Sequence, residues 1–149
     1  MRKFFELGIR EDMSSEERRL LRFHRFNIIA LLWISPLFGL WSFSRGGTFD
    51  ATLQLISLVM YLYALRLTLG GKHLASKILY NFGATAVLFG FWLILPSHMM
   101  YPWWLLTMLY AGAVFRGNER KWKLASMSLS GGLFAYGVWF DFQHHGQLP

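Results

Sequence analysis

Long stretches without charge alternate with short polar segments along this chain of 149 residues. Four stretches contain no Asp, Glu, Lys or Arg, and a fifth contains only Asp50; they are residues 27–43, 78–95, 102–115, 124–140 and 49–65. Surface helices of soluble proteins carry polar residues along one whole face, and these stretches do not. Because about 20 mainly apolar residues cross a bilayer as a helix, the pattern predicts an all-α, polytopic membrane bundle. We expect transmembrane helices at about residues 27–43, 49–69, 78–95, 99–115 and 124–140.

The segments between these stretches have the Gly, Pro and charged residues that are typical of turns. Their sequences are SRGGT, GGKHLASK, PSHMMYP and RGNERKWK. The chain therefore divides into a basic arm with a helix start (1–25), a five-helix bundle (26–142) and a short tail (143–149). The fourth span is the shortest, and a re-entrant segment there would reduce the number of crossings to four.

The positions of the basic residues predict the orientation. Of the 15 Lys and Arg residues, all except Arg45 lie in the N-terminal arm, the second-to-third connection or the fourth-to-fifth connection. Cytoplasmic loops of membrane proteins are enriched in Lys and Arg. We therefore expect a cytoplasmic N-terminus, an outer C-terminus and a location in a bacterial inner membrane. This distribution explains the net charge of +7 by contact with the lipid bilayer, and no nucleic-acid partner is expected.

The N-terminal arm has a helix-start signal. Ser14 and Glu17 have the spacing of a capping box, in which each side chain accepts from the other residue's backbone N–H. Arginines follow further along the same segment, where they suit the helix dipole. A helix is expected to run from about Ser15 into the first span.

Residues 4–31 resemble the start of the multi-helix membrane domain of bacterial sensor histidine kinases and receptor-type nucleotide cyclases. The similar segments are Phe4–Ile9 (FFELGI), Ser15–Leu20 (SEERRL) and Asn27–Leu31 (NIIAL). The resemblance implies a sensory membrane bundle. No kinase or cyclase domain follows here, and an odd number of spans places the C-terminus outside. We therefore expect either a free-standing relative or a bundle that lacks a sixth helix.

Small residues predict where the helices approach closely, because close packing drives association in lipid. One stripe lies on the third span and one on the fifth: Gly83, Ala86 and Gly90, then Ala125, Ser128, Gly132 and Ala135. We expect interhelical contacts at both, including contacts with each other, and the alternative is a dimer seam. Pro36 should bend the first span, since proline removes a backbone donor. Trp33, near mid-span, is expected to pack between helices.

A candidate ligand site lies in the predicted outer half of the bundle. It comprises Gln54, Trp92, Trp103 and Trp104. Polar residues within a span are costly and therefore notable. For Gln54 and Asn81 an interhelical hydrogen bond or contact with headgroup water is the first interpretation, and contact with a substrate is the second.

A second candidate site gathers imidazole and carboxylate groups on the predicted outer side. Its residues are His98, Asp141, His144 and His145, a combination suited to Zn²⁺ or another transition metal. Their spacing matches no known metal motif, and solvated tail residues are the alternative. His24 and His73 are interpreted as interface residues among cytoplasmic cations. No histidine lies deep in a span, so no buried haem, and no other cofactor, is predicted.

Several function classes lack their sequence motifs here. The chain has no P-loop, HExxH, GxSxG or paired intramembrane aspartates, and no cysteine for thiol chemistry. We therefore expect a non-enzymatic sensory or regulatory bundle, or an accessory subunit of a membrane assembly. Other membrane subunits or further copies of this chain are its expected partners. A small oligomeric transporter or channel is the first alternative, and a membrane-embedded enzyme with an outer metal site is the second.

Overall fold

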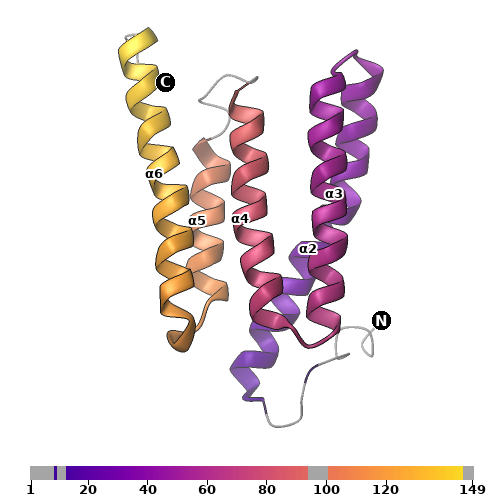
Figure 1. Ribbon diagram of the computed structural model, residues 1–149, viewed down its shortest axis with the longest axis vertical. Helices are drawn as coiled ribbons and strands as arrows, with labels where there is room; N and C mark the ends of the chain where they lie inside the picture. Colours follow the sequence, from indigo (N-terminus) through magenta and orange to yellow (C-terminus); the bar gives the residue numbers. More distant parts are fainter. Residues whose placement is uncertain (1–8, 10–12, 94–100, 146–149) are drawn as a thin grey trace. The chain divides into compact units, whose positions relative to one another are not determined.

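The structure is a computed structural model that describes residue 9, residues 13–93 and residues 101–145. Its elements, in order, are α2 (Ser15–Ser44), α3 (Thr48–Leu69), α4 (His73–Trp92), α5 (Tyr101–Val114), the 3₁₀ helix η2 (Gly117–Glu119) and α6 (Arg120–His145) (Figure 1). No strand occurs in these residues. The all-α prediction is confirmed for the described part of the chain.

The predicted helix start is confirmed at α2. The Ser14 hydroxyl accepts from the backbone N–H of Glu17 at 3.2 Å, and the Glu17 carboxylate accepts from the N–H of Ser14 at 2.8 Å. This capping box satisfies two backbone donors that no helical carbonyl can reach. From there α2 continues without interruption through Pro36 to Ser44.

The turns are shorter than the polar segments predicted. Of GGKHLASK, only Gly70–Lys72 lies outside a helix, and α4 begins at His73. The length of a charge-free stretch predicts the part of a helix that suits lipid. The helix itself continues beyond that stretch for as long as its backbone hydrogen bonds are formed. The turns before α3 and α4 each need one residue with positive φ, which Gly46 (79°) and Gly71 (78°) supply.

The chain forms two compact units whose boundary falls within α4, between Gly83 and Ala84. In the first unit, α2 packs along α3, and a Cβ added to Gly39 would lie 3.3 Å from the Cβ of Gln54. In the second unit, α5 packs along α6. The glycine at 39 thus permits close approach of the first two helices.

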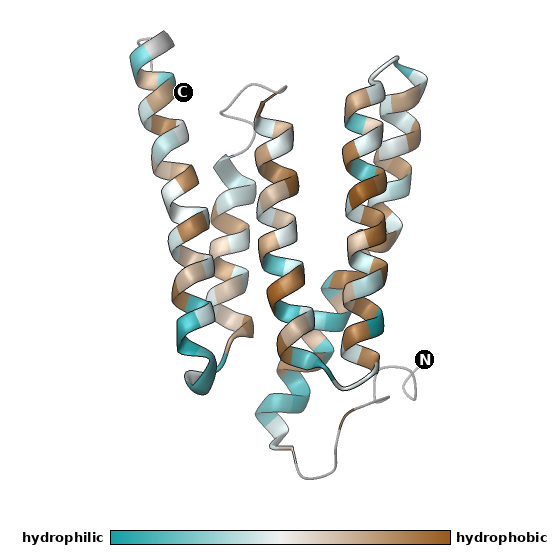
Figure 2. Ribbon diagram, in the orientation of Figure 1, coloured by the Kyte–Doolittle hydropathy of each residue, from teal (hydrophilic) through white to brown (hydrophobic). Residues whose placement is uncertain are grey.

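The distribution of polarity is the reverse of that in a soluble domain. Large apolar side chains are exposed along the helices, among them Trp33 at 74% and Leu40 at 70%. The buried positions include many polar residues: His24, Arg25, Ser57, Thr68, Ser76, Asn81, Thr85, Ser126 and Ser130. Figure 2 shows hydrophobic residues along much of α3 and the later half of α2, and hydrophilic residues in the first turns of α2 and α6. Such a surface suits lipid rather than water.

Three described helices are long and apolar enough to cross a membrane, namely α2, α3 and α4. Helix α5 has 14 residues, which correspond to about 21 Å against a hydrocarbon core of about 30 Å. Helix α6 has 26 residues, but it is not among these three. Its Ser and Gly residues and its charged first turn lower its hydropathy. The structure thus supports a membrane-type helical bundle.

Packing along the predicted small-residue stripes is uneven. Gly83 meets Met60 of α3 so closely that an added Cβ would lie 1.8 Å from the Met60 sulfur. Ala86 is exposed and Gly90 is half-buried. On α6 the predicted seam is exposed at all four positions (Ala125, Ser128, Gly132 and Ala135), while Ser126, Ser130, Gly137 and Asp141 form the buried face. Residue size alone does not identify the packed face, because adjacent faces of α6 both carry small residues.

Trp33 was expected to pack between helices. Its side chain is 74% exposed, so it does not pack between helices in the described structure. A large indole fits against lipid chains as well as against protein. The sequence pattern therefore does not distinguish a buried mid-span tryptophan from a lipid-facing one.

Candidate functional site

A polar cluster in the first unit joins α2 to the end of α3 and the start of α4. It consists of His24, Arg25, Thr68, His73 and Ser76. The Ser76 hydroxyl donates to the carbonyl of Ala64 at 2.7 Å and lies 2.9 Å from Nε2 of His24. Since a serine hydroxyl has a single proton, Nε2 of His24 donates to Ser76. The hydrogen bonds therefore assign the Nε2–H tautomer to a histidine that is fully buried.

Arg25 is also fully buried, and its guanidinium caps a helix end. Nη2 donates to the backbone carbonyl of Thr68 at 3.1 Å, one residue before the last of α3. The last carbonyls of a helix have no partner within it and carry the negative end of the helix dipole. A cation there is favoured, and Thr68 in turn lies 3.3 Å from Nδ1 of His73.

The interpretation of His24 and His73 as interface residues stays a prediction, but His24 is buried among the helices rather than exposed. Its ring is enclosed, with an edge-on contact to Tyr80 at 5.5 Å between ring centroids. The interpretation rested on neighbouring charges, which indicate proximity to the membrane boundary. They do not reveal that Ser76 and Tyr80 of α4 contact the ring.

An aromatic cluster in the second unit brings together α5, α6 and the later half of α4. Its members are Trp92, Trp104, Tyr136 and Phe140. The ring of Trp92 lies 6.1 Å from Trp104, 5.8 Å from Tyr136 and 5.7 Å from Phe140, with the last two in edge-on geometry. These separations are typical of favourable aromatic pairs.

Two buried donors distinguish this cluster. Trp104 is 1% exposed, and neither its indole Nε1 nor the buried Nε1 of Trp92 has a hydrogen-bond partner among the described residues. Most buried polar atoms have a partner in the protein or in ordered water, so an exception calls for an explanation. Burying an indole N–H without a hydrogen-bond acceptor in an apolar setting costs free energy.

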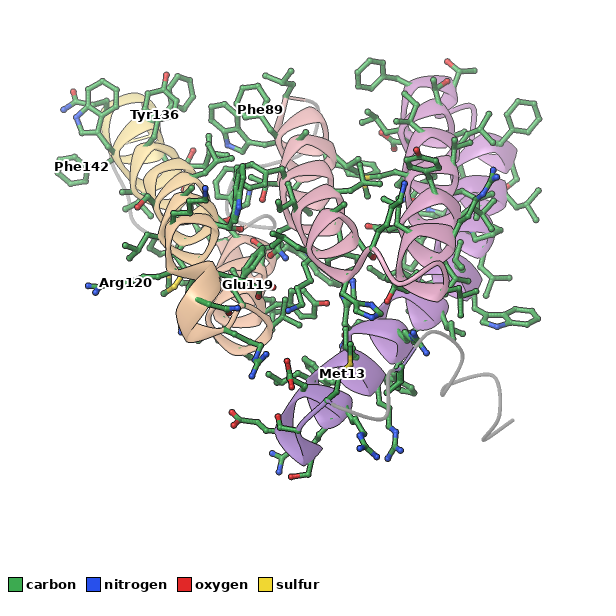
Figure 3. The ribbon with its side chains drawn as sticks, turned by 60° about the horizontal axis from the view of Figure 1, so that its bottom comes forward. Met13, Phe89, Glu119, Arg120, Tyr136 and Phe142 are labelled. Atoms are coloured by element: carbon green, nitrogen blue, oxygen red, sulfur yellow. The ribbon has the colours of Figure 1, made fainter. Side chains whose placement is uncertain are left out.

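Two rings at the edge of the aromatic cluster are partly exposed. Phe89, whose ring lies 5.6 Å from Trp92, is 38% exposed, and Tyr136 is 48% exposed. Figure 3 labels these two side chains near the ends of α4 and α6. Phe89 and Tyr136 therefore place part of the cluster at the surface of the second unit.

Three hydroxyl groups connect the three helices of the second unit. The Ser130 oxygen lies 3.2 Å from the Thr85 oxygen and 3.3 Å from the Thr107 oxygen. Hydroxyl bonds of this kind join helices where no water is present. They join α4, α5 and α6 to one another within the second unit.

A hydrogen bond between Tyr101 and Asp141 joins α5 to α6 near the end of α6. The tyrosine hydroxyl donates to the carboxylate at 2.5 Å, and Asp141 is 7% exposed. A carboxylate that accepts from a hydroxyl forms a charge-assisted hydrogen bond. Tyr101 also contacts Trp104, at 6.3 Å between ring centroids. The Tyr101 side chain therefore contacts both the Asp141 carboxylate and the aromatic cluster.

The predicted ligand residues belong to two different units of the chain. In the second unit, Trp92 and Trp104 share one cluster, whereas Trp103 is 51% exposed. Gln54 is half-buried on α3 in the first unit, where its Cβ faces Gly39. Adjacent residues of a helix face different directions, which explains why Trp103 and Trp104 differ.

The predicted metal residues lie partly outside the description. Helix α6 includes His144 and His145, but their side chains and the whole of His98 are outside the described residues. Asp141 is held by Tyr101. Among the described residues, no group of three or more His, Cys, Asp or Glu is placed to hold a metal. The predicted metal site stays a prediction.

Gly137 positions the aromatic cluster. A Cβ at this residue would lie 2.8 Å from Cζ3 of Trp104 and 3.1 Å from Cε1 of Tyr101. We expect Gly137→Ala to lower the free energy of unfolding by about 1 to 3 kcal/mol, because two rigid rings would have to move. Denaturation of the purified protein in detergent would measure the change.

Gly132→Ala provides the matched control on the same helix. Nothing lies within 4 Å of a Cβ added there. Alanine is the better helix former by up to about 1 kcal/mol, so this variant should be neutral or slightly stabilised. Equal losses in both variants would contradict the packing described for Gly137.

Comparison with known proteins adds no further evidence on function. No family model matches the chain. No curated protein and no solved structure matches it either.

Proposed function

We propose that this chain is a multi-pass membrane protein with five crossings, a cytoplasmic N-terminus and an outer C-terminus. The observation that carries the membrane assignment is the reversed polarity, with exposed Leu, Phe and Trp around buried Ser, Thr, His and Arg. The crossing number and orientation rest on the charge-free stretches and on the basic connections. On this proposal α5 and α6 complete the bundle, and the protein resides in a bacterial inner membrane.

Single cysteines would test the topology, because the native chain has none. We expect Ser44→Cys and Gln143→Cys to react with a membrane-impermeant maleimide in intact cells. Asn118→Cys should react only after permeabilisation. All three residues are exposed and lie at or near helix ends. Protection of Gln143→Cys in intact cells would overturn the five-span arrangement.

We further propose that the protein acts as a sensory or regulatory bundle, or as an accessory subunit, rather than as an enzyme. Its aromatic cluster would recognise an apolar ligand or partner helix from the bilayer. The main support is the buried indole nitrogens of Trp92 and Trp104, beside the partly exposed rings of Phe89 and Tyr136. The resemblance of residues 4–31 to sensor membrane domains supports the sensory alternative.

Binding of methylnaphthalene, an apolar aromatic probe, would test the ligand-binding version of this role in lipid nanodiscs. Trp92→Ala and Trp104→Ala should each weaken binding roughly tenfold, since an aromatic side chain contributes about 1 to 2 kcal/mol in such contacts. Trp103→Ala, which alters an exposed neighbour, is the matched control. The same affinity in all three variants and the native protein would remove the proposed ligand site.

A further inference from the structure

We propose that the aromatic cluster binds a neutral carbonyl oxygen of a lipophilic molecule, with Nε1 of Trp92 and Trp104 as the donors. This inference rests on the proposed function and names the ligand class for the same site. It follows from the two indole nitrogens, which are both buried and both without an acceptor in the described structure.

The indole N–H fixes the kind of atom that must be supplied. It donates and cannot accept, so an oxygen acceptor satisfies it, whereas a hydrocarbon or an ammonium group does not. A buried donor that is left without an acceptor destabilises the protein. A ligand with an acceptor would recover that cost in the bound state.

The surroundings select a neutral acceptor on an apolar body. Asp141 accepts from Tyr101, and Tyr101 lies against Trp104. A carboxylate this close repels a phosphate or a second carboxylate. The rings of Tyr136 and Phe140 around Trp92 favour an apolar, preferably planar, body.

Two sources can supply such an oxygen from the bilayer. One is a dissolved quinone-like molecule, and the other is the ester carbonyl of a phospholipid. Both would present a carbonyl oxygen to the indole donors. Ether-linked lipids lack the ester carbonyl, so an experiment in such lipids distinguishes the two sources.

The experiment follows the indole N–H signals by NMR. The protein would carry ¹⁵N-labelled tryptophan in ether-lipid nanodiscs, with Trp92→Phe and Trp104→Phe used to assign the two signals. Menadione, a methylated naphthoquinone, is compared with methylnaphthalene, which has the same rings without carbonyls. The chain has no cysteine with which the quinone could react.

Menadione is expected to move the Trp92 and Trp104 signals downfield, as hydrogen bonding does, and to leave Trp103 unchanged. Methylnaphthalene should give no downfield shift. Trp92→Phe and Trp104→Phe keep an aromatic ring but remove a donor, so each should weaken menadione binding roughly fivefold. In ester-linked lipid without a probe, a downfield shift would assign the same site to the lipid carbonyl.

Three results would overturn the inference. Equal binding of both probes, unaffected by the Phe variants, would leave an apolar site standing and remove the carbonyl requirement. Signals already downfield in ether lipid, and unchanged by menadione, would show that a buried water serves the donors. Binding of neither probe would remove both this inference and the proposed ligand site.

Discussion

Arg25→Glu is expected to lower the free energy of unfolding by about 3 kcal/mol or more, the range seen when a buried charge loses its partner. The native guanidinium is fully buried and donates to the carbonyl of Thr68 near the end of α3. A carboxylate at this position would face that carbonyl and the negative end of the helix dipole. Denaturation of the purified protein in detergent would measure the loss.

Arg22→Glu makes the same charge change one turn earlier on α2, at an exposed residue. Surface substitutions usually alter stability by about 0.5 kcal/mol or less. The comparison therefore separates the cap on α3 from the general effect of removing a positive charge from the arm. Similar losses in the two variants would contradict the capping role of Arg25.

Gly83→Ala is expected to lower the free energy of unfolding by about 1 to 3 kcal/mol. The added Cβ would lie 1.8 Å from the sulfur of Met60 and 3.1 Å from its two neighbouring carbons. Contact over three atoms of one side chain means that Met60 must leave its position between α3 and α4. The same denaturation measurement applies.

Met60→Ala offers a test by rescue. It removes the atoms that the new Cβ would meet, so the double variant should lose about 1 to 2 kcal/mol less than the sum of the single losses. Combining Met60→Ala with Gly132→Ala gives the control, because Gly132 has no neighbour within 4 Å. If the losses of Gly83→Ala and Met60→Ala simply added in the double variant, the two side chains would not compete for the same space.

The candidate site was only partly predictable from the sequence. Trp92 and Trp104 were singled out because tryptophans gather in the predicted outer half of the bundle. Trp103 was grouped with them, yet it is exposed. The cluster of His24, Arg25 and Ser76 was missed, because its members lie far apart in the sequence and look like ordinary basic and polar residues near turns.

By itself, the sequence determined the helical class, the membrane-type composition and the start of the first helix. These features depend on local chemistry, since the length of an apolar stretch and the capping box of Ser14 and Glu17 act within a few turns. The tertiary structure decided which helix faces are buried, because neighbouring faces of α6 carry similar small residues. It also decided that Arg25 caps α3 and that Trp92 meets Trp104, since both contacts join residues from different helices.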